Sequence, residues 1–147
     1  MQIKTADFGE ITIDEASIIN FPEGIPAFEE FHEYVLINVV EEIPYLYYMQ
    51  GIGENAPCFA VIDLYYFVAD YIPHISPADV KNLQCSGLEE LRYLAIAIIE
   101  PELEKSVMNL KSPLVICPET RKAKQIVLEN DDYPLRYPLF VPNGKEE

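Results

Sequence analysis

Tryptophan is absent from this sequence of 147 residues, and cysteine and histidine are scarce. The three cysteines, Cys58, Cys85 and Cys117, are odd in number and widely separated, and two of them lie in the apolar runs PCFAVI and LVICP. We therefore expect buried free thiols rather than a disulfide framework. The two histidines, His32 and His74, have no cysteine or histidine partner at ligand spacing. The sequence predicts no metal site and no cofactor.

Long apolar runs are also missing. No stretch approaches the ~18 consecutive apolar residues needed to cross a bilayer. Lys4 is the only base among the first 20 residues, where an export signal places a basic start and then an apolar segment. The sequence therefore predicts a cytoplasmic protein without a membrane segment. Half of its residues are apolar, which is enough for one core in a chain of about 150 residues.

Bases are scarce in the first part of the chain. Residues 1–80 hold 14 carboxylates and one base, Lys4, whereas residues 81–147 hold 11 carboxylates and nine bases, so that −13 of the net charge of −15 lies in the first part. A field of this sign repels phosphate and argues against direct nucleic-acid binding. It attracts a basic protein partner. The alternative is that the acidic surface serves solubility alone.

The segment FPEGIPAFEEF, residues 21–31, combines turn residues with apolar ones. A helix is excluded because Pro22 and Pro26 each lack an amide donor and push the preceding residue out of the helical region. A strand is excluded because Gly24 and Pro26 interrupt the ladder. The segment is predicted to be an ordered bend between strands.

Short apolar and aromatic runs on either side of this bend predict β-strands. IKTADFGEITI is typical of two strands joined at Gly9. YVLINVV, YLYYMQG and CFAVIDLYYFV are β-branched or aromatic and are separated by turn signals. ELRYLAIAII fits a helix or a strand buried on both faces, and we assign a strand because its neighbours are strands.

The remaining segments complete the expected fold. SPADVKNL predicts one short helix, with Ser76 as N-cap and Pro77 at the first helical position. LVI and QIVL form an expected hairpin whose tip holds Arg121, Lys122 and Lys124. The proline-rich DDYPLRYPLFVP is expected at a sheet edge or as an extended arm. We predict an all-β, mostly antiparallel barrel or sandwich-like single domain over residues 1–142, with a frayed tail at 143–147.

No catalytic motif stands out in the chain. It contains no GxGxxG, GxxxxGK[ST], GxSxG or HExxH sequence. The glycines of GIGENA have the wrong spacing for a phosphate loop, and Glu54 lies among them. A non-enzymatic binding protein is the favoured interpretation. The alternative is a small-molecule-binding or hydrolytic β-barrel that uses clustered carboxylates and tyrosines.

Four blocks of the chain resemble the FliW family of bacterial flagellar assembly factors. In order they are FGEITIDEASIINFPEGIPAFEEF, YMQG with the acidic loop and FAVID after it, SVMNLKSPLVIC, and KQIVLENDDYPLR. Together they follow the order of that family and span almost the whole chain, which makes the set specific. Where the family pattern has leucine and glycine, this chain has Ile25 and Ala27.

The resemblance implies a small β-barrel-like protein without catalysis that binds two cytosolic partners and is a monomer when free. One partner is flagellin, whose amphipathic terminal helices suit an apolar groove. The other is the carbon storage regulator CsrA, a basic RNA-binding protein that represses flagellin translation. When flagellin is exported, the freed factor captures CsrA and relieves the repression.

Two segments supply the candidate partner-binding residues. In the bend, carboxylates suit a basic partner, and the phenylalanines are anchors if exposed but structural if they pack inward. In SVMNLKSP, Leu110 is expected to face inward, and it and Pro113 are anchors only if exposed. The asparagine either satisfies backbone groups at a turn or contacts a partner. The candidates are Glu23, Phe28, Glu29, Phe31, Asn109, Leu110, Lys111 and Pro113.

Overall fold

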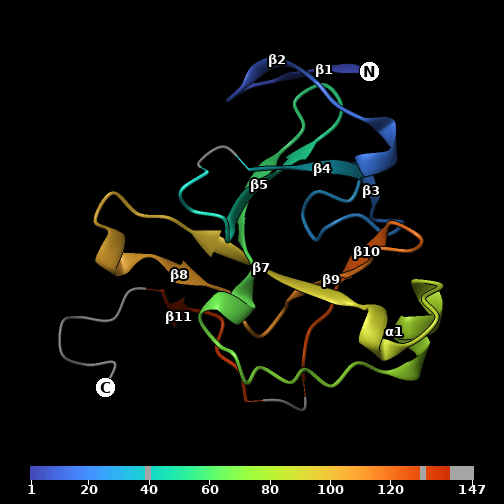
Figure 1. Ribbon diagram of the computed structural model, residues 1–147, viewed down its shortest axis with the longest axis vertical. Coiled ribbons are helices and arrows are strands. Elements are labelled where there is room, and N and C mark those ends of the chain that lie inside the picture. Colours follow the sequence, from blue (N-terminus) through green and yellow to red (C-terminus); the bar gives the residue numbers. More distant parts are fainter. Residues whose placement is uncertain (39–40, 130–131, 140–147) are drawn as a thin grey trace.

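The protein is a closed β-barrel with a two-stranded hairpin at one end and a helical segment at the other (Figure 1). This computed structural model describes residues 1–38, 41–129 and 132–139. The expected tail at 143–147 and the expected domain end at 142 lie outside the described residues. No helix in the described ranges is both long and apolar enough to cross a membrane.

Seven strands close the barrel. They are β3 (Ile19–Asn20), β4 (Glu33–Ile37), β5 (Leu46–Gly51), β6 (Cys58–Ile62), β7 (Arg92–Ile98), β9 (Leu114–Cys117) and β10 (Lys122–Gln125). All neighbours pair antiparallel except β3 and β10, which meet in parallel at Asn20 and Lys122. The predicted all-β, mostly antiparallel barrel with one short helix is confirmed.

Strand β7 joins the barrel to a small edge extension. The first half of β7 pairs with β9, and its last residues pair with β8 (Val107–Met108) along the same edge. Strand β11 (Tyr137–Pro138) then pairs with β8 at the outside of the sheet. The expectation that the proline-rich end forms an edge segment is confirmed for residues 137–138, since proline lacks the donor that a central strand needs.

Apolar side chains fill the barrel interior. Each barrel strand contributes at least one of them, and the bend adds Phe21 and Ile25. The buried members are Ile19, Phe21, Ile25, Tyr34, Met49, Val61, Leu94, Leu114, Ile116 and Ala123. Among the described residues, a pocket that reaches this core at Ile19, Leu94 and Ile116 has a volume of about 140 Å³, which is below the roughly 300–1,000 Å³ typical of small-molecule sites.

Tyr34 is the one interior side chain of this set that carries a polar atom. Its ring packs edge-on against Phe21 at 5.3 Å, and its hydroxyl is buried without a hydrogen-bond partner among the described residues. Burial and, to a lesser extent, the nearby Glu30 carboxylate raise the pKa of Tyr34 from 10.0 to about 12.

Replacing Tyr34 by phenylalanine is expected to raise the free energy of unfolding at pH 7 and to reduce the loss of this free energy at alkaline pH. At pH 7 the change removes an unsatisfied buried hydroxyl, worth about 1 kcal/mol. Above pH 10 the unfolded chain loses the tyrosine proton while the folded protein keeps it, so the free energy of unfolding falls as the pH rises from 10 to 12. Urea unfolding from pH 7 to 11 measures both effects, and the exposed Tyr66→Phe is the matched control. Equal alkaline losses in wild type and Tyr34→Phe would contradict this assignment.

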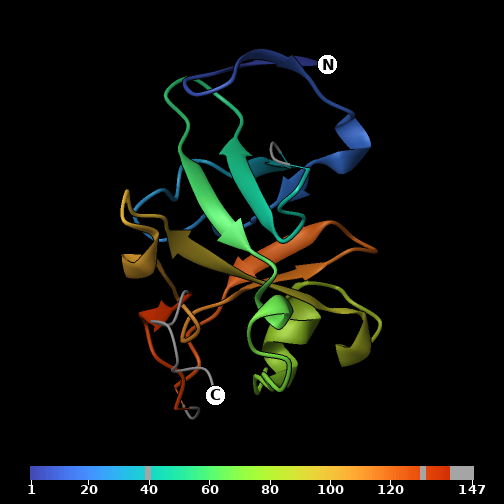
Figure 2. The same cartoon turned by 60° about the vertical axis from the view of Figure 1, so that its left-hand side comes forward.

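A second core lies outside the barrel, between β7, β9 and the segments that cover them. Helix α1 (Pro77–Asn82) and the 3-10 helices η2 (Leu64–Tyr66) and η3 (Leu88–Glu90) belong to this layer, which Figure 2 shows at the end of the barrel opposite the β1–β2 hairpin. The Ser76 hydroxyl accepts from the Asp79 amide at 3.1 Å. The predicted N-cap and the predicted helix are confirmed.

The first hairpin stands apart from the barrel sheet. Strands β1 (Gln2–Thr5) and β2 (Gly9–Thr12) form a separate two-stranded sheet, as predicted, and the turn between them uses Gly9 at φ +69°. The short 3-10 helix η1 (Glu15–Ser17) follows, and η4 (Leu103–Lys105) precedes β8. The ring of Phe8 packs edge-on against that of Tyr48 at 5.6 Å and connects the hairpin to β5.

Two strand predictions are partly wrong. Strand β6 ends at Ile62, and LYY forms η2 because the chain turns at Asp63, whose carbonyl accepts from the Tyr66 amide at 3.1 Å. The hairpin after β9 returns through KAKQ rather than QIVL. Arg121 lies in its tight turn at φ +62°, so Lys122 and Lys124 belong to β10 rather than to the tip.

The expectation of free thiols is wrong for two of the three cysteines. Cys85, after α1, is disulfide-bonded to Cys117 at the end of β9, with their Cα atoms 5.7 Å apart. Cys58 is free and half-buried. The pairing joins residues 32 positions apart, and it depends on how the outer segment packs on the barrel. It therefore fastens the α1 segment to β9.

Candidate functional site

The bend at residues 21–31 is an ordered series of turns anchored in the barrel. Phe21 and Ile25 are buried in the interior core, and the Phe21 amide donates to the carbonyl of His32 at 2.7 Å. Tight turns follow, with bonds from the Gly24 amide to Phe21 and from the Phe28 amide to Ile25. The prediction of a bend between strands is confirmed.

Glu23 takes part in a charged cluster that ties three elements together. The ammonium group of Lys124, on β10, lies 3.7 Å from the Glu23 carboxylate and 3.0 Å from that of Asp79, on α1. Its hydrogen bond to Asp79 is the main reason that the pKa of Lys124 is raised. Part of the negative charge of Glu23 is therefore balanced within the protein.

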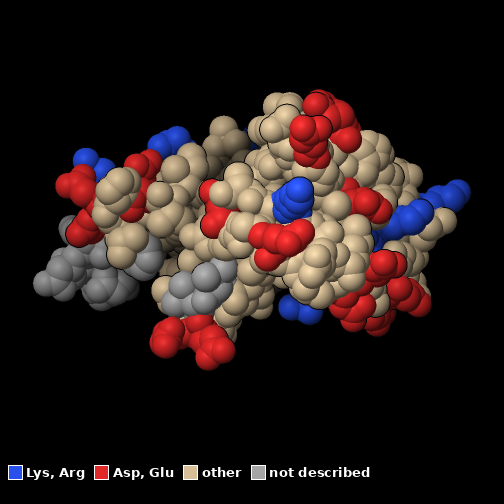
Figure 3. Space-filling view, turned by 90° about the horizontal axis from the view of Figure 1, so that it is seen from above, with Lys and Arg blue, Asp and Glu red and all other residues tan. Residues whose placement is uncertain are grey.

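The other carboxylates of the bend are exposed, and they differ in their surroundings. The carboxylate of Glu29 accepts from the Ala27 amide at 3.2 Å and supports the local turn. Glu30, in the bend, and Glu33, at the start of β4, are also exposed. Figure 3, which looks onto the hairpin end, shows several groups of acidic side chains with only a few bases between them. The acidic surface here is distributed rather than gathered in one pocket.

Phe28 and Phe31 are half-buried. They are therefore neither fully exposed anchors nor fully inward-packed residues, the two alternatives that the sequence left open. The ring of Phe28 packs edge-on against that of Phe59 at 5.3 Å. Phe31 packs against the interior core and lies over Gly53 of the β5–β6 loop. Both rings have a structural role, and each keeps part of its surface accessible beside the carboxylates.

The segment from Asn109 to Pro113 forms a turn between β8 and β9. The Asn109 side-chain oxygen accepts from the amides of Lys111 at 3.0 Å and Ser112 at 2.9 Å, which is the turn role considered from the sequence. Leu110 is only 1% exposed, and Pro113 is also buried. A partner-binding anchor must be exposed. Leu110 and Pro113 are both buried, so neither side chain is an anchor. Lys111 is half-exposed.

An apolar cleft lies beside this turn, and no feature of the sequence predicted it. It has a volume of about 270 Å³ and includes Ile98 and Leu135, which are 49% and 57% exposed. The sequence predicted a strand that is buried on both faces as far as Ile99. Ile98 and Ile99 are instead exposed, so the prediction of burial is wrong for these two residues. Leu135 is brought close to β7 by the pairing of β11 with β8 and by the bonds from the Leu110 and Lys111 amides to the Pro134 carbonyl, which no local pattern indicates.

One group of potential metal ligands is present among the described residues. The ligand atoms of Cys85, Cys117 and Glu119 lie within 4.8 Å of one another. Both sulfurs are used in the disulfide, so neither is available as the thiolate that a metal requires.

Comparison with known proteins agrees with the arrangement of these segments. The family model described as FliW protein matches residues 2–139. Proteins named flagellar assembly factor FliW are similar along the whole chain. That of Syntrophomonas wolfei is 35% identical, covering 100% of this chain and 94% of its own, and that of Ruminiclostridium cellulolyticum is 34% identical, covering 100% and 99%.

The fold agrees with a solved relative as well. A crystal structure of the flagellar assembly factor FliW superimposes with a TM-score of 0.88 at 26% sequence identity, covering 97% of this chain and 99% of the other. Ordered blocks, barrel topology and full-length similarity all lead to the same assignment. The chain belongs to the FliW family of flagellar assembly factors.

Proposed function

We propose that this protein is a non-enzymatic, cytoplasmic regulator that binds flagellin and, when freed, binds and antagonises the RNA-binding repressor CsrA. Family membership over the full chain is the observation that carries the proposal. Binding one partner at a time links the export of flagellin to its synthesis, because each flagellin that leaves frees one molecule of the factor to capture the repressor.

The distribution of charge supports a basic partner at the bend. Residues 1–80 carry most of the negative charge, and Glu30 and Glu33 are exposed next to the accessible parts of Phe28 and Phe31. Exposed carboxylates accelerate the approach of a basic protein, and desolvated aromatic rings then contribute most of the affinity. We assign CsrA to this face.

The apolar cleft supports a different partner. Ile98 and Leu135 present exposed aliphatic surface at the β7–β8 edge, with Arg136 alongside. An amphipathic helix can place its apolar face on such a surface. We assign a terminal helix of flagellin to the cleft, so that the two partners use separate surfaces and communicate through the barrel or by steric exclusion.

Reversing charge on the bend is expected to slow association with CsrA. The variant Glu30→Lys/Glu33→Lys removes exposed carboxylates and leaves the Glu23 ion pair and the Glu29 turn bond in place. We expect the association rate constant at low salt to fall by about three- to tenfold, and the difference to shrink at high salt. Stopped-flow mixing at two salt concentrations measures both quantities.

The control variant changes the net charge by the same amount at positions outside the bend. Glu104→Lys/Glu129→Lys alters two exposed residues from the C-terminal half of the chain, so a purely global effect of charge would slow both double variants equally. Equal slowing of the two double variants would contradict the assignment of CsrA to the bend. Calorimetry with purified flagellin and CsrA tests the wider proposal, and an absence of binding to either partner would overturn it.

Binding of flagellin is expected to depend on the cleft. Ile98→Asp places a charge where an apolar helix face would lie, and we expect at least a tenfold loss of flagellin affinity. Ile72→Asp, at a position that is 65% exposed outside the cleft, is the control. Equal affinities for flagellin in calorimetry of these two variants would place flagellin on another surface.

A further inference from the structure

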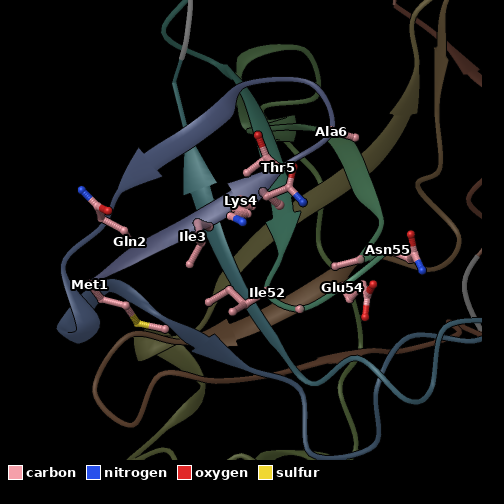
Figure 4. Close-up of a pocket in the computed structure, with 12 residues that line it drawn as sticks. Met1, Gln2, Ile3, Lys4, Thr5, Ala6, Ile52, Glu54 and Asn55 are labelled. Atoms are coloured by element: carbon pink, nitrogen blue, oxygen red, sulfur yellow. The ribbon is translucent and has the colours of Figure 1, made fainter.

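A groove between the first hairpin and the β5–β6 loop has no part in the proposed function. Its volume is about 620 Å³, and it is lined by residues 1–6, Gln50 and residues 52–56. Figure 4 shows Met1, Ile3 and Ile52 around one part of the groove and Glu54 and Asn55 in another. The groove thus combines an apolar wall with a polar one.

One wall of the groove is an unpaired strand edge. All residues of β1 line the groove and none of β2 does, so it lies on the side of β1 opposite β2. In the register of this hairpin Met1 faces Ile13, and the Ile13 amide donates to the Met1 carbonyl at 2.8 Å. Since bonded and non-bonded pairs alternate, the peptide groups of Gln2 and Lys4 point away from β2. Within the described ranges β1 pairs with β2 alone.

A buried, unpaired acceptor adjoins this edge. Gln50, near the end of β5, lines the groove and is only 2% exposed. Its side-chain nitrogen donates to the Gly51 carbonyl at 2.9 Å, whereas its side-chain oxygen has no hydrogen-bond partner in the part of the chain that the structure describes. An unsatisfied buried acceptor is unfavourable, and a donor that enters the groove removes this penalty.

The dimensions of the groove suit one extended peptide. A strand of four residues is about 14 Å long, and in a layer about 4.8 Å wide and 10 Å thick it fills roughly 650 Å³. That matches both the groove volume of about 620 Å³ and the four residues of β1. Alternate side chains of such a peptide would face the apolar wall near Ile3 and Ile52.

The surrounding charge selects a basic peptide. The hairpin, the residues just after it and the loop carry one lysine, Lys4, against five carboxylates, which are Asp7, Glu10, Asp14, Glu15 and Glu54. We propose that the groove binds an extended, basic segment of a partner protein, which adds a strand to the free edge of β1 and donates a hydrogen bond to Gln50. This peptide-binding site is separate from the cleft and borders the bend at Gly53, over which Phe31 lies.

The test uses a defined probe rather than either proposed flagellar partner. A capped peptide of about eight residues, with lysine and valine alternating, is titrated into isotopically labelled protein and followed through the amide signals of Gln2 and Lys4. We expect binding, slower hydrogen exchange of these two amides, and loss of binding when alternate peptide amides are methylated, because methylation removes main-chain donors. A glutamate–valine peptide is expected to bind at least tenfold more weakly.

Matched proline variants separate the two edges of the hairpin. Lys4→Pro removes a donor at the groove edge, and Glu10→Pro removes one at the opposite edge, because Lys4 and Glu10 face each other in a non-bonded pair. We expect at least a tenfold loss of peptide affinity for Lys4→Pro and less than a twofold change for Glu10→Pro. Gln50→Met, which removes the acceptor and keeps the length, is expected to lose about fivefold.

Several results would overturn the site. They are no binding at millimolar peptide, equal binding of the methylated peptide, or equal losses in the two proline variants. Amide protection of Ile3 and Ile11 reports whether Lys4→Pro keeps the hairpin. If it does not, the methylated peptide on the unaltered protein still decides the question. Because flagellin and CsrA are not used, failure here leaves their proposed binding intact.

Discussion

Gly24→Ala is expected to destabilise the protein by about 3–4 kcal/mol. Gly24 has φ +71°, a region that costs an L-residue about 1–2 kcal/mol. A Cβ at this position would lie 2.6 Å from both the Cα and the carbonyl oxygen of Glu29. Backbone atoms cannot rotate away as the end of a side chain can, so the bend itself must shift. The side chains of Phe21 and Ile25 then no longer pack fully in the barrel core.

Thermal and urea unfolding measure the effect of Gly24→Ala. For a domain of this size the expected loss corresponds to a fall in melting temperature of roughly 6–16 °C. Gly9→Ala is the matched control, since Gly9 has nearly the same φ, +69°, but nothing within 4 Å of the added Cβ. We expect only the conformational cost there, about 1 kcal/mol. Equal losses at the two positions would show that the close approach to Glu29 contributes nothing.

Ala27 provides the converse change in the same bend. It has φ +76° and stands where the pattern that this chain resembles has glycine. Ala27→Gly relieves the left-handed conformation, although glycine also gains entropy in the unfolded chain. The net effect is a small stabilisation, which makes the variant a useful check that the bend responds to backbone conformation rather than to any substitution.

Reducing the Cys85–Cys117 disulfide is expected to lower the free energy of unfolding by about 3–4 kcal/mol. The bond closes a loop of 32 residues, and in the chain-entropy description the loss of that closure costs this amount. The α1 segment then depends on its apolar packing and on the Lys124–Asp79 ion pair.

Unfolding with and without dithiothreitol, in a Cys58→Ala background, measures the contribution of the disulfide. The background removes the free thiol, and reduction leaves every other side chain unchanged. Thiol titration of the denatured wild type without reductant is expected to find one free thiol, that of Cys58. Three free thiols, or an unfolding midpoint unaffected by reduction, would contradict the assigned bond.

Features set by local chemistry were predictable. The hairpin at Gly9, the bend at FPEGIPAFEEF and the Ser76 N-cap each depend on a few adjacent residues whose conformational limits are strong. Helix or strand propensity did not settle the segment after Leu91, and assigning a strand from its neighbours was correct for β7 (Arg92–Ile98). The errors at LYY and QIVL arose because aromatic and β-branched content favours strands even where a turn has already redirected the chain.

The candidate site was less predictable than the fold. Glu23 and Glu29 are on the surface as expected, but their ion pair and turn bond depend on Lys124 and Ala27. Leu110 was expected to face inward and was a candidate anchor only if exposed, and it is a core residue. Exposure depends on which face of a segment meets the rest of the chain, and a short turn has no periodicity that reveals it.

The sequence by itself determined the class of fold, the places where the chain turns, the asymmetry of charge and the resemblance to the FliW family. All of these follow from residue types within a few positions of one another or from their order along the chain. Only the tertiary structure decided the pairing of Cys85 with Cys117, the cleft at Ile98 and Leu135, and the groove in which Gln50 is left unpaired. Each joins residues far apart in the sequence, so its existence depends on how the barrel closes and what packs against it.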